Sequence, residues 1–156
     1  MSIQMSLQEA AFAMDAKLVG NTQSFSGVST DSRIHCINTL FFALRGDNFD
    51  GHDFLKTAQE NGALAAVVDE EGALRAPDNF PLLIVDDTRL ALGRLAAHWR
   101  ANFNLPLIAV TGSNGKTTTK EMVASILKAS FGENVLATEG NFNNDIGLPL
   151  TLLKLN

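Results

Sequence analysis

The sequence predicts an α/β fold in which a small N-terminal α/β domain is followed by the beginning of a P-loop nucleotide-binding domain. Short apolar runs alternate with amphipathic stretches of helical period along the first hundred residues, which indicates interleaved strands and helices. A glycine-rich turn, Thr-Gly-Ser-Asn-Gly-Lys-Thr at 111–117, lies between an apolar run and a further helical stretch. The 156 residues, 46% hydrophobic and 19% charged, suit a globular protein of one domain or slightly more.

Three helices are expected in the first hundred residues: 6–18, 52–61 and 87–103. In the first, Leu7 and Met14 share one face and Ser6 can act as the N-cap. The second is closed by Gly62, a typical helix terminator. The third has a long apolar stripe that includes Leu95, which predicts a helix packed on a core.

Four short apolar runs predict strands at 27–30, 40–44, 65–68 and 82–85. Asn104 and Pro106 then interrupt the pattern, so we place a domain boundary there, giving domains of 1–104 and 105–156. The second is expected to hold strands at 105–110 and 134–137 around a helix at 121–131. A nucleotide-binding sheet normally has about five or more strands, so this domain is expected to be incomplete and the chain to be the front part of a longer enzyme.

Composition argues against several classes of function. The net charge is −5, with 17 acidic and 12 basic residues, which disfavours nucleic-acid and membrane-surface binding. No apolar run approaches the roughly 18 residues of a membrane span, and the N-terminus lacks the features of a signal peptide. A single cysteine, Cys36, excludes an intrachain disulfide. We therefore expect a cytoplasmic protein without membrane insertion.

The glycine-rich turn has the composition of a phosphate-binding loop. Backbone N–H groups and the helix dipole favour an anion at a helix N-terminus. Gly112 and Gly115 allow close approach of the backbone, Lys116 adds a positive charge, and Thr117 can offer a hydroxyl to Mg²⁺. The standard pattern has glycine where this chain has Val110, and the alternative is a tight turn with a surface lysine. The expected nucleotide-binding residues are Thr111, Gly112, Ser113, Asn114, Gly115, Lys116, Thr117 and Thr118.

Three other polar segments follow predicted strands. Those at 27–33 and 45–52 would converge on one ligand if their strands are neighbours, and a diphosphate or uracil would suit their Arg and Ser side chains. The third, 138–149, contains three Asn and one Asp in five positions and would lie beside the phosphate loop, where α/β sheets bind ligands. Ordinary turn chemistry is the alternative for all three.

Taken together, these segments resemble the Mur ligase family over nearly all of the chain. The shared phosphate loop, Gly-x-x-Gly-Lys-Thr, also accounts for Val110. One departure is Ile37-Asn38, where the family usually has Pro-Gly; Asn tolerates a positive φ. The matching segments are 29–33, 40–46, 50–54, 87–91, 111–121 and 140–149.

The resemblance implies an ATP-dependent ligase with ATP and Mg²⁺ as cofactors, acting in peptidoglycan precursor synthesis. The Asn-x-Asn-Asn-Asp-Ile-Gly pattern is more typical of the member that joins D-alanyl-D-alanine to UDP-N-acetylmuramoyl-tripeptide through an acyl phosphate. Domain 1–104 would then bind the UDP end of the substrate and 105–156 would open the ATP-binding domain. The implied roles are catalysis for Lys116, Mg²⁺ binding for Thr117, and substrate binding for Ser32, Arg33, Arg45, Gly46, Asn141 and Asn144.

By the same resemblance, the last domain would lie beyond Asn156, so the chain by itself is expected to be an inactive N-terminal fragment. Its unpartnered apolar residues after Asn104 could then promote self-association. Two other functions stay open. One is a UDP-sugar-binding module without catalysis. The other is the related ligase that adds the third amino acid to UDP-N-acetylmuramoyl-dipeptide.

Overall fold

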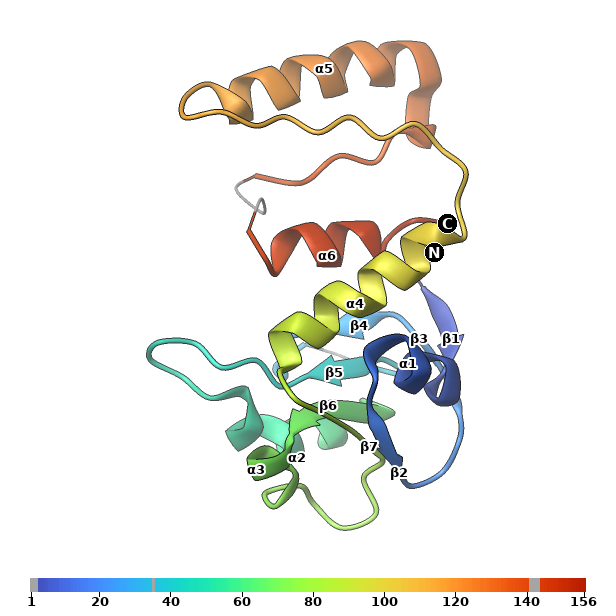
Figure 1. Cartoon of the computed structure of the whole chain (residues 1–156), viewed down its shortest axis with the longest axis vertical. Helices are drawn as coiled ribbons and strands as arrows, with labels where there is room; N and C mark the ends of the chain where they lie inside the picture. The colour runs from blue at the N-terminus through green and yellow to red at the C-terminus, as the bar shows by residue number, and fades with distance from the viewer. Residues whose placement is uncertain (1–2, 35, 141–143) are drawn as a thin grey trace.

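A computed structural model, which describes residues 3–34, 36–140 and 144–156, contains a five-stranded sheet covered by helices (Figure 1). The strand order is β2-β7-β6-β5-β4. Strands β4, β5, β6 and β7 are parallel to one another, and β2 pairs antiparallel with β7 at one edge. The predicted α/β class is therefore confirmed. The strands are β2 (Lys17–Val19), β4 (Val28–Ser29), β5 (Leu40–Phe42), β6 (Ala65–Asp69) and β7 (Leu82–Val85).

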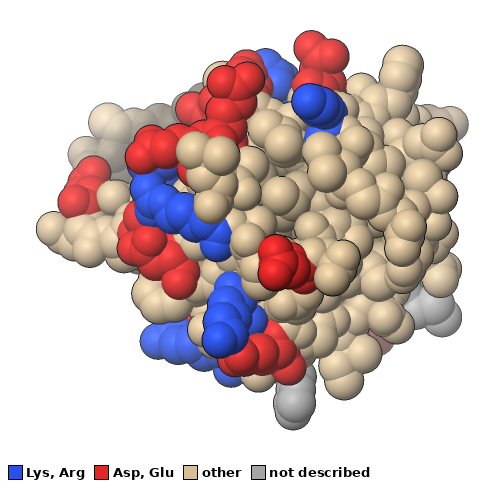
Figure 2. Space-filling view, turned by 90° about the horizontal axis from the view of Figure 1, so that it is seen from below, with Lys and Arg blue, Asp and Glu red and all other residues tan. Residues whose placement is uncertain are grey.

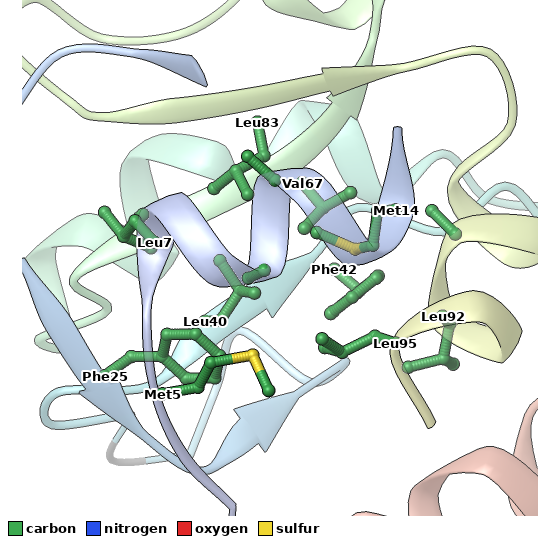
Figure 3. Packing of buried hydrophobic residues seen from close by; sticks show 14 of the residues in the cluster. Met5, Leu7, Met14, Phe25, Leu40, Phe42, Val67, Leu83, Leu92 and Leu95 are labelled. Carbon is green, nitrogen blue, oxygen red and sulfur yellow. The ribbon is translucent and has the colours of Figure 1, made fainter. Parts of the chain in front are cut away.

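The central strands are buried on both faces because alternate side chains enter two separate cores. Leu40 and Phe42 of β5 belong to the larger core, whereas Phe41 between them belongs to the smaller one. In β6, Val67 likewise faces the larger core and Val68 the smaller. Figure 3 shows Phe42 and Val67 in the larger core together with side chains from the covering helices.

Helices α1 (Leu7–Met14) and α4 (Thr88–Ala101) cover the larger core, and α2 (Leu55–Glu60) covers the smaller. The Ser6 cap is confirmed, because its side chain accepts from the Glu9 backbone N–H at 3.1 Å. The predicted extension of this helix to residue 18 is wrong. Asp15 takes a left-handed conformation with φ of 57° and ends α1, so that Lys17 enters β2.

Several short elements were not expected from the sequence. Strands β1 (Gln4–Ser6) and β3 (Ser24–Ser26) form a separate two-stranded antiparallel sheet. A 3-10 turn, η1 (Gly51–Phe54), precedes α2, and α3 (Glu70–Ala73) follows β6 directly. Each has four residues or fewer, which is too short for a clear hydrophobic period in the sequence.

Beyond Phe103 the chain forms what we call the α5 arm, residues 105–140. It contains α5 (Lys116–Phe131) and the 3-10 turn η2 (Gly132–Asn134). The strands predicted at 105–110 and 134–137 are absent from the described part of this arm. A strand needs a hydrogen-bonded partner, and neither segment has one here. Within α5 only Ala124 is buried.

Helix α6 (Gly147–Leu152) returns to the first hundred residues and lies beside α4 (Figure 1). Leu153 is buried in the larger core, and its carbonyl accepts from the backbone N–H of Ile3 at 3.0 Å. The Trp99 side chain donates to the carbonyl of Leu155 at 3.0 Å. We therefore use the name N-terminal body for residues 3–103 together with 146–155.

Among the residues that the structure describes, no helix is both long and apolar enough to span a membrane. The face in Figure 2 carries acidic and basic side chains next to one another, mostly toward one side, whereas the other side is mostly uncharged among the residues described. Charges of both signs are therefore interspersed on that face.

Candidate functional site

The glycine-rich loop is exposed and leads directly into the first turn of α5. Gly112 has a φ of 145° and Gly115, the N-cap residue, a φ of 77°. Side chains rarely adopt such values, so the sequence places glycine where the backbone requires it. The Lys116 ammonium donates to the Gly112 carbonyl and so folds back over the loop. The N-terminal amides of a 16-residue helix and this cation thus lie at one exposed point.

The other predicted loop residues surround this point. Thr111, Ser113, Asn114, Thr117 and Thr118 are all exposed. Thr117, which was predicted to bind Mg²⁺, is thus not covered by the rest of the chain. The described residues contain no group of three or more His, Cys, Asp or Glu side chains that could hold a metal ion.

Lys120, one helical turn after Lys116, connects α5 to the end of the arm. Its ammonium donates to the carbonyls of Thr138 at 2.5 Å and Gly140 at 3.3 Å. This contact brings the start of the Asn-rich segment to the helix that follows the glycine-rich loop. Asn141 lies outside the described residues. The Asn144 side-chain oxygen accepts from the backbone N–H groups of Ile146 and Gly147, at 3.3 and 2.7 Å, and so shapes the turn before α6.

The segments after β4 and β5 lie at the same edge of the sheet, because these strands are parallel neighbours. The condition for the convergence of segments 27–33 and 45–52 is therefore met. Arg33 is exposed and forms a bidentate ion pair with Asp31, with Nε–Oδ1 and Nη2–Oδ2 distances of 2.9 and 2.8 Å. Hydrogen bonding from Arg33 lowers the pKa of Asp31 to about 2. Ser32 is buried, and its carbonyl accepts from Asn61.

Arg45 lies at the centre of an ion-pair network. Its guanidinium contacts Asp69 at 2.9 Å, Glu71 at 3.1 Å and Asp50 at 3.3 Å. The hydrogen bond to Asp69 raises the pKa of Arg45 further above its ordinary value. Gly46 is covered by the ring of Phe49, 2.9 Å from where a Cβ would lie. Both arginines are thus engaged by carboxylates, and binding of a ligand phosphate would require them to exchange partners.

The buried His52 side chain contacts two members of this network, Asp50 and Asp69. Its side chain is fully buried, with Nδ1 2.6 Å from Asp50 Oδ1, and Nε2 accepts from the Asp69 backbone N–H at 3.2 Å. In this arrangement Nε2 is the acceptor for the Asp69 backbone N–H, and Nδ1 faces the Asp50 carboxylate. Burial opposes ionisation of Asp50, but hydrogen bonds from His52 lower its pKa overall. Gly72 is required beside the ring, because a Cβ there would lie 1.8 Å from it.

A cavity of about 430 Å³ lies between β4 and α6. Thr30 and Asp31 line it from the N-terminal body, Glu139 from the α5 arm, and Thr151 and Lys154 from α6 and the residues after it. Lys154 and Glu139 form an ion pair at 3.0 Å. The cavity lining is mainly apolar, with hydroxyls and charges of both signs among its residues.

The predicted residues Ser32, Arg33, Arg45 and Gly46 do not line this cavity, although Arg33 is bonded to Asp31, which does. The cavity residues Thr151 and Lys154 were not among the predicted site residues. Thr151 lies in the short helix α6 and Lys154 follows it. A helix of this length has too few apolar positions to be recognised from the sequence.

Comparison with known proteins gives consistent matches along the chain. The model described as Mur ligase family, catalytic domain, matches residues 24–100, and the Mur ligase middle domain matches 110–156. UDP-N-acetylmuramoyl-tripeptide--D-alanyl-D-alanine ligase of Haemophilus influenzae is 49% identical over 98% of this chain and 34% of its own length.

Two solved structures are also similar. A crystal structure of MurF from Acinetobacter baumannii has a TM-score of 0.86 and 39% identity over 99% of this chain and 34% of that one. MurF ligase from Thermotoga maritima, solved in complex with ADP, has a TM-score of 0.71 and 34% identity over 82% of this chain and 29% of that one. This chain thus spans about a third of the length of these relatives. The two family models lie one after the other and together cover most of its residues, so the chain belongs to the Mur ligase family.

Proposed function

We propose that the protein is an ATP-dependent ligase of peptidoglycan precursor synthesis, which joins D-alanyl-D-alanine to UDP-N-acetylmuramoyl-tripeptide. The observation that carries the proposal is the exposed glycine loop and Lys116 at the N-terminus of α5, in a chain 49% identical to a ligase with this name. A UDP-sugar-binding module has no need of a second, phosphate-binding loop. The family assignment favours the ligase.

The residues at the loop fit the phosphates of ATP. The two positive-φ glycines expose backbone amides, and no side chain lies within 4 Å of where a Gly115 Cβ would be. Lys116 would leave the Gly112 carbonyl to meet the phosphates, where charge develops during transfer. ATP would supply the phosphoryl group that converts the terminal carboxylate of the tripeptide into an acyl phosphate, which the amine of D-alanyl-D-alanine then attacks. For Mg²⁺, we propose Thr117 and the nucleotide phosphates as ligands.

The substrate is proposed to bind between the N-terminal body and the α5 arm. The UDP end would lie at the segments after β4 and β5, where Ser32, Arg33, Arg45 and Gly46 stand. The muramoyl-peptide end would extend to the turn that holds Asn144, with Asn141 as a further proposed contact. The cavity lined by Asp31 and Glu139 lies between these two regions and supports this orientation.

The test is phosphate release by the natural polypeptide that contains these residues, with ATP and Mg²⁺, UDP-N-acetylmuramoyl-tripeptide and D-alanyl-D-alanine. We expect phosphate release to require all three substrates. Replacing the tripeptide with the dipeptide precursor, and D-alanyl-D-alanine with a single amino acid, tests the related ligase. Turnover only with the dipeptide, or binding of the UDP-sugar without any ATP-dependent turnover, would overturn the proposal in favour of one of its alternatives.

The location of the UDP end is tested separately with Arg33→Ala. The variant should bind UDP-N-acetylmuramoyl-tripeptide more weakly by about tenfold, in line with a lost charge-assisted hydrogen bond. Its affinity for ATP should be unchanged, since Arg33 and Lys116 belong to different predicted domains. Equal loss of both ligands would contradict two separate sites.

A further inference from the structure

The Asp-Thr-Arg segment at 87–89 matches the family pattern, but the site described above gives it no role. Its first two residues form three hydrogen bonds. The Asp87 carboxylate accepts from the backbone N–H groups of Arg89 and Leu90, at 2.8 and 2.9 Å, and so caps α4. The buried Thr88 hydroxyl donates to the Ala43 carbonyl at 3.0 Å. These contacts fix the start of α4 against the chain that leaves β5.

Arg89 then reaches two segments that are far apart in the sequence. Its Nη2 donates to the Arg45 carbonyl at 2.9 Å, and its Nη1 lies 3.3 Å from Asp145 Oδ2. Arg45 follows β5, and Asp145 stands beside Asn144 in the turn before α6. One guanidinium therefore connects three of the family-like segments: 40–46, 87–91 and 140–149.

We propose that Arg89 is a positioning residue that holds the Asn144–Asp145 turn at a fixed distance from the loop after β5. The planar guanidinium suits this role because it can contact the carbonyl and the carboxylate at the same time, whereas a lysine ammonium is a single point charge. With respect to ligand binding this inference rests on the proposed function, because these two segments carry the two ends of the proposed substrate site.

A second arginine on the same helix provides a matched control. Arg94 pairs with Asp86 at 2.8 Å and donates to the Met14 carbonyl at 3.2 Å. Its side chain is 39% exposed and that of Arg89 45%, but all contacts of Arg94 lie within the first hundred residues. If an arginine contributes only to the stability of α4, Arg89→Ala and Arg94→Ala should have similar effects. If Arg89 positions the turn, only Arg89→Ala should disturb it.

The first measurement needs no ligand. Hydrogen exchange at the Ile146 and Gly147 amides, which donate to Asn144, should accelerate about two- to fivefold in Arg89→Ala, as expected for an exposed pair. Arg94→Ala should leave these amides unchanged. Arg89→Lys should give an intermediate rate, and Arg89→Ala combined with Asp145→Ala should be no faster than the faster of the two single variants.

The second measurement is the affinity of this chain for UDP-N-acetylmuramoyl-tripeptide, which should weaken about two- to fivefold in Arg89→Ala and be retained in Arg94→Ala. Unchanged exchange at both amides, equal effects of the two alanine variants, or additive effects in the double variant would overturn the positioning role. Failure of the unsubstituted chain to bind this ligand would instead contradict the proposed substrate, and the exchange data would still decide the role of Arg89.

Discussion

The N-terminal body and the α5 arm differ in how their apolar side chains are used. Phe42, Leu83 and Leu95 are fully buried in the body. In the arm, Ile108 is 60% exposed and Ile126 is 66% exposed. The arm contains the right residues for a sheet and a covering helix, yet without partner strands these residues remain in solvent. The strands of this protein therefore depend on pairing with neighbouring strands, whereas α5 is helical although only Ala124 in it is buried.

The largest expected difference is in hydrogen exchange. Amides of β6 and β7 should exchange only through global unfolding, which for a stability of about 5 kcal/mol or more means protection of at least about 10³-fold. Amides at 105–110 and 135–139 have no backbone partner in the structure and should exchange close to the rate of an unfolded chain. Comparable protection in the two regions would show that the arm pairs in solution, for example by self-association through Leu107 and Ile126.

Substitution of one apolar residue in the larger core and one in the α5 arm should sharpen the comparison. Phe42→Ala removes a fully buried ring from the larger core and should lower the free energy of unfolding by about 3–5 kcal/mol. The matched variant Ile126→Ala in α5 should change it by no more than about 0.5 kcal/mol. Urea unfolding followed by circular dichroism measures both. A large loss in the second variant would mean that α5 packs against the body.

Ligase activity, unlike stability, should depend strongly on a residue of the α5 arm. Lys116→Ala in the natural polypeptide should reduce ligase turnover by about a hundredfold or more, as for loss of one charge-stabilising donor. Its free energy of unfolding should stay unchanged, because the loop is exposed. Lys128→Ala, on the last turn of the same helix, is the control and should retain turnover. Near-normal phosphate release by Lys116→Ala would refute the role of the loop.

The smallest effect concerns the Arg33–Asp31 pair. Because the folded pKa of Asp31 is lowered, its contribution to stability is present above its ordinary value of 3.8 and is lost as the pH falls toward about 2. An NMR titration of the Asp31 carboxyl should have its midpoint near 2, and Arg33→Ala should move it up toward 3.8. A midpoint that Arg33→Ala leaves unchanged would mean that the pair does not form in solution.

The sequence predicted those elements whose pattern is long or strongly apolar. The stripe around Leu95 gave α4 within two residues at each end, and the range of β7 agrees with the prediction at both ends. Helix α6 was missed because Asn is frequent in the segment before it and Gly147 and Pro149 lie within it. Pro149 is nevertheless compatible with a helix, since it stands in the first turn, where no backbone N–H is needed.

The candidate site likewise has features that the sequence predicted and features that it did not. The loop pattern identified Gly112 and Gly115 as positions without a Cβ, and the structure adds that both have a positive φ. The partners of Arg45 could not be predicted, because Asp69 and Glu71 are 24 and 26 residues away and reach it only through the pairing of β5 with β6. Spacing along the chain identifies a loop, whereas contacts between strand ends require the topology of the sheet.

The hydrogen bond between Ile3 and Leu153 has a consequence for the order of events during synthesis. The N-terminal body uses residues from both ends of a 156-residue chain, so a nascent polypeptide that has emerged only as far as α4 still lacks the last piece of its core. The Ile3 backbone N–H and the Trp99 side chain would lack their partners Leu153 and Leu155 while the whole α5 arm leaves the ribosome. Closure of so long a loop is slow compared with local helix formation. The contacts of α6 and Leu153 with the body therefore form only after the arm has been made.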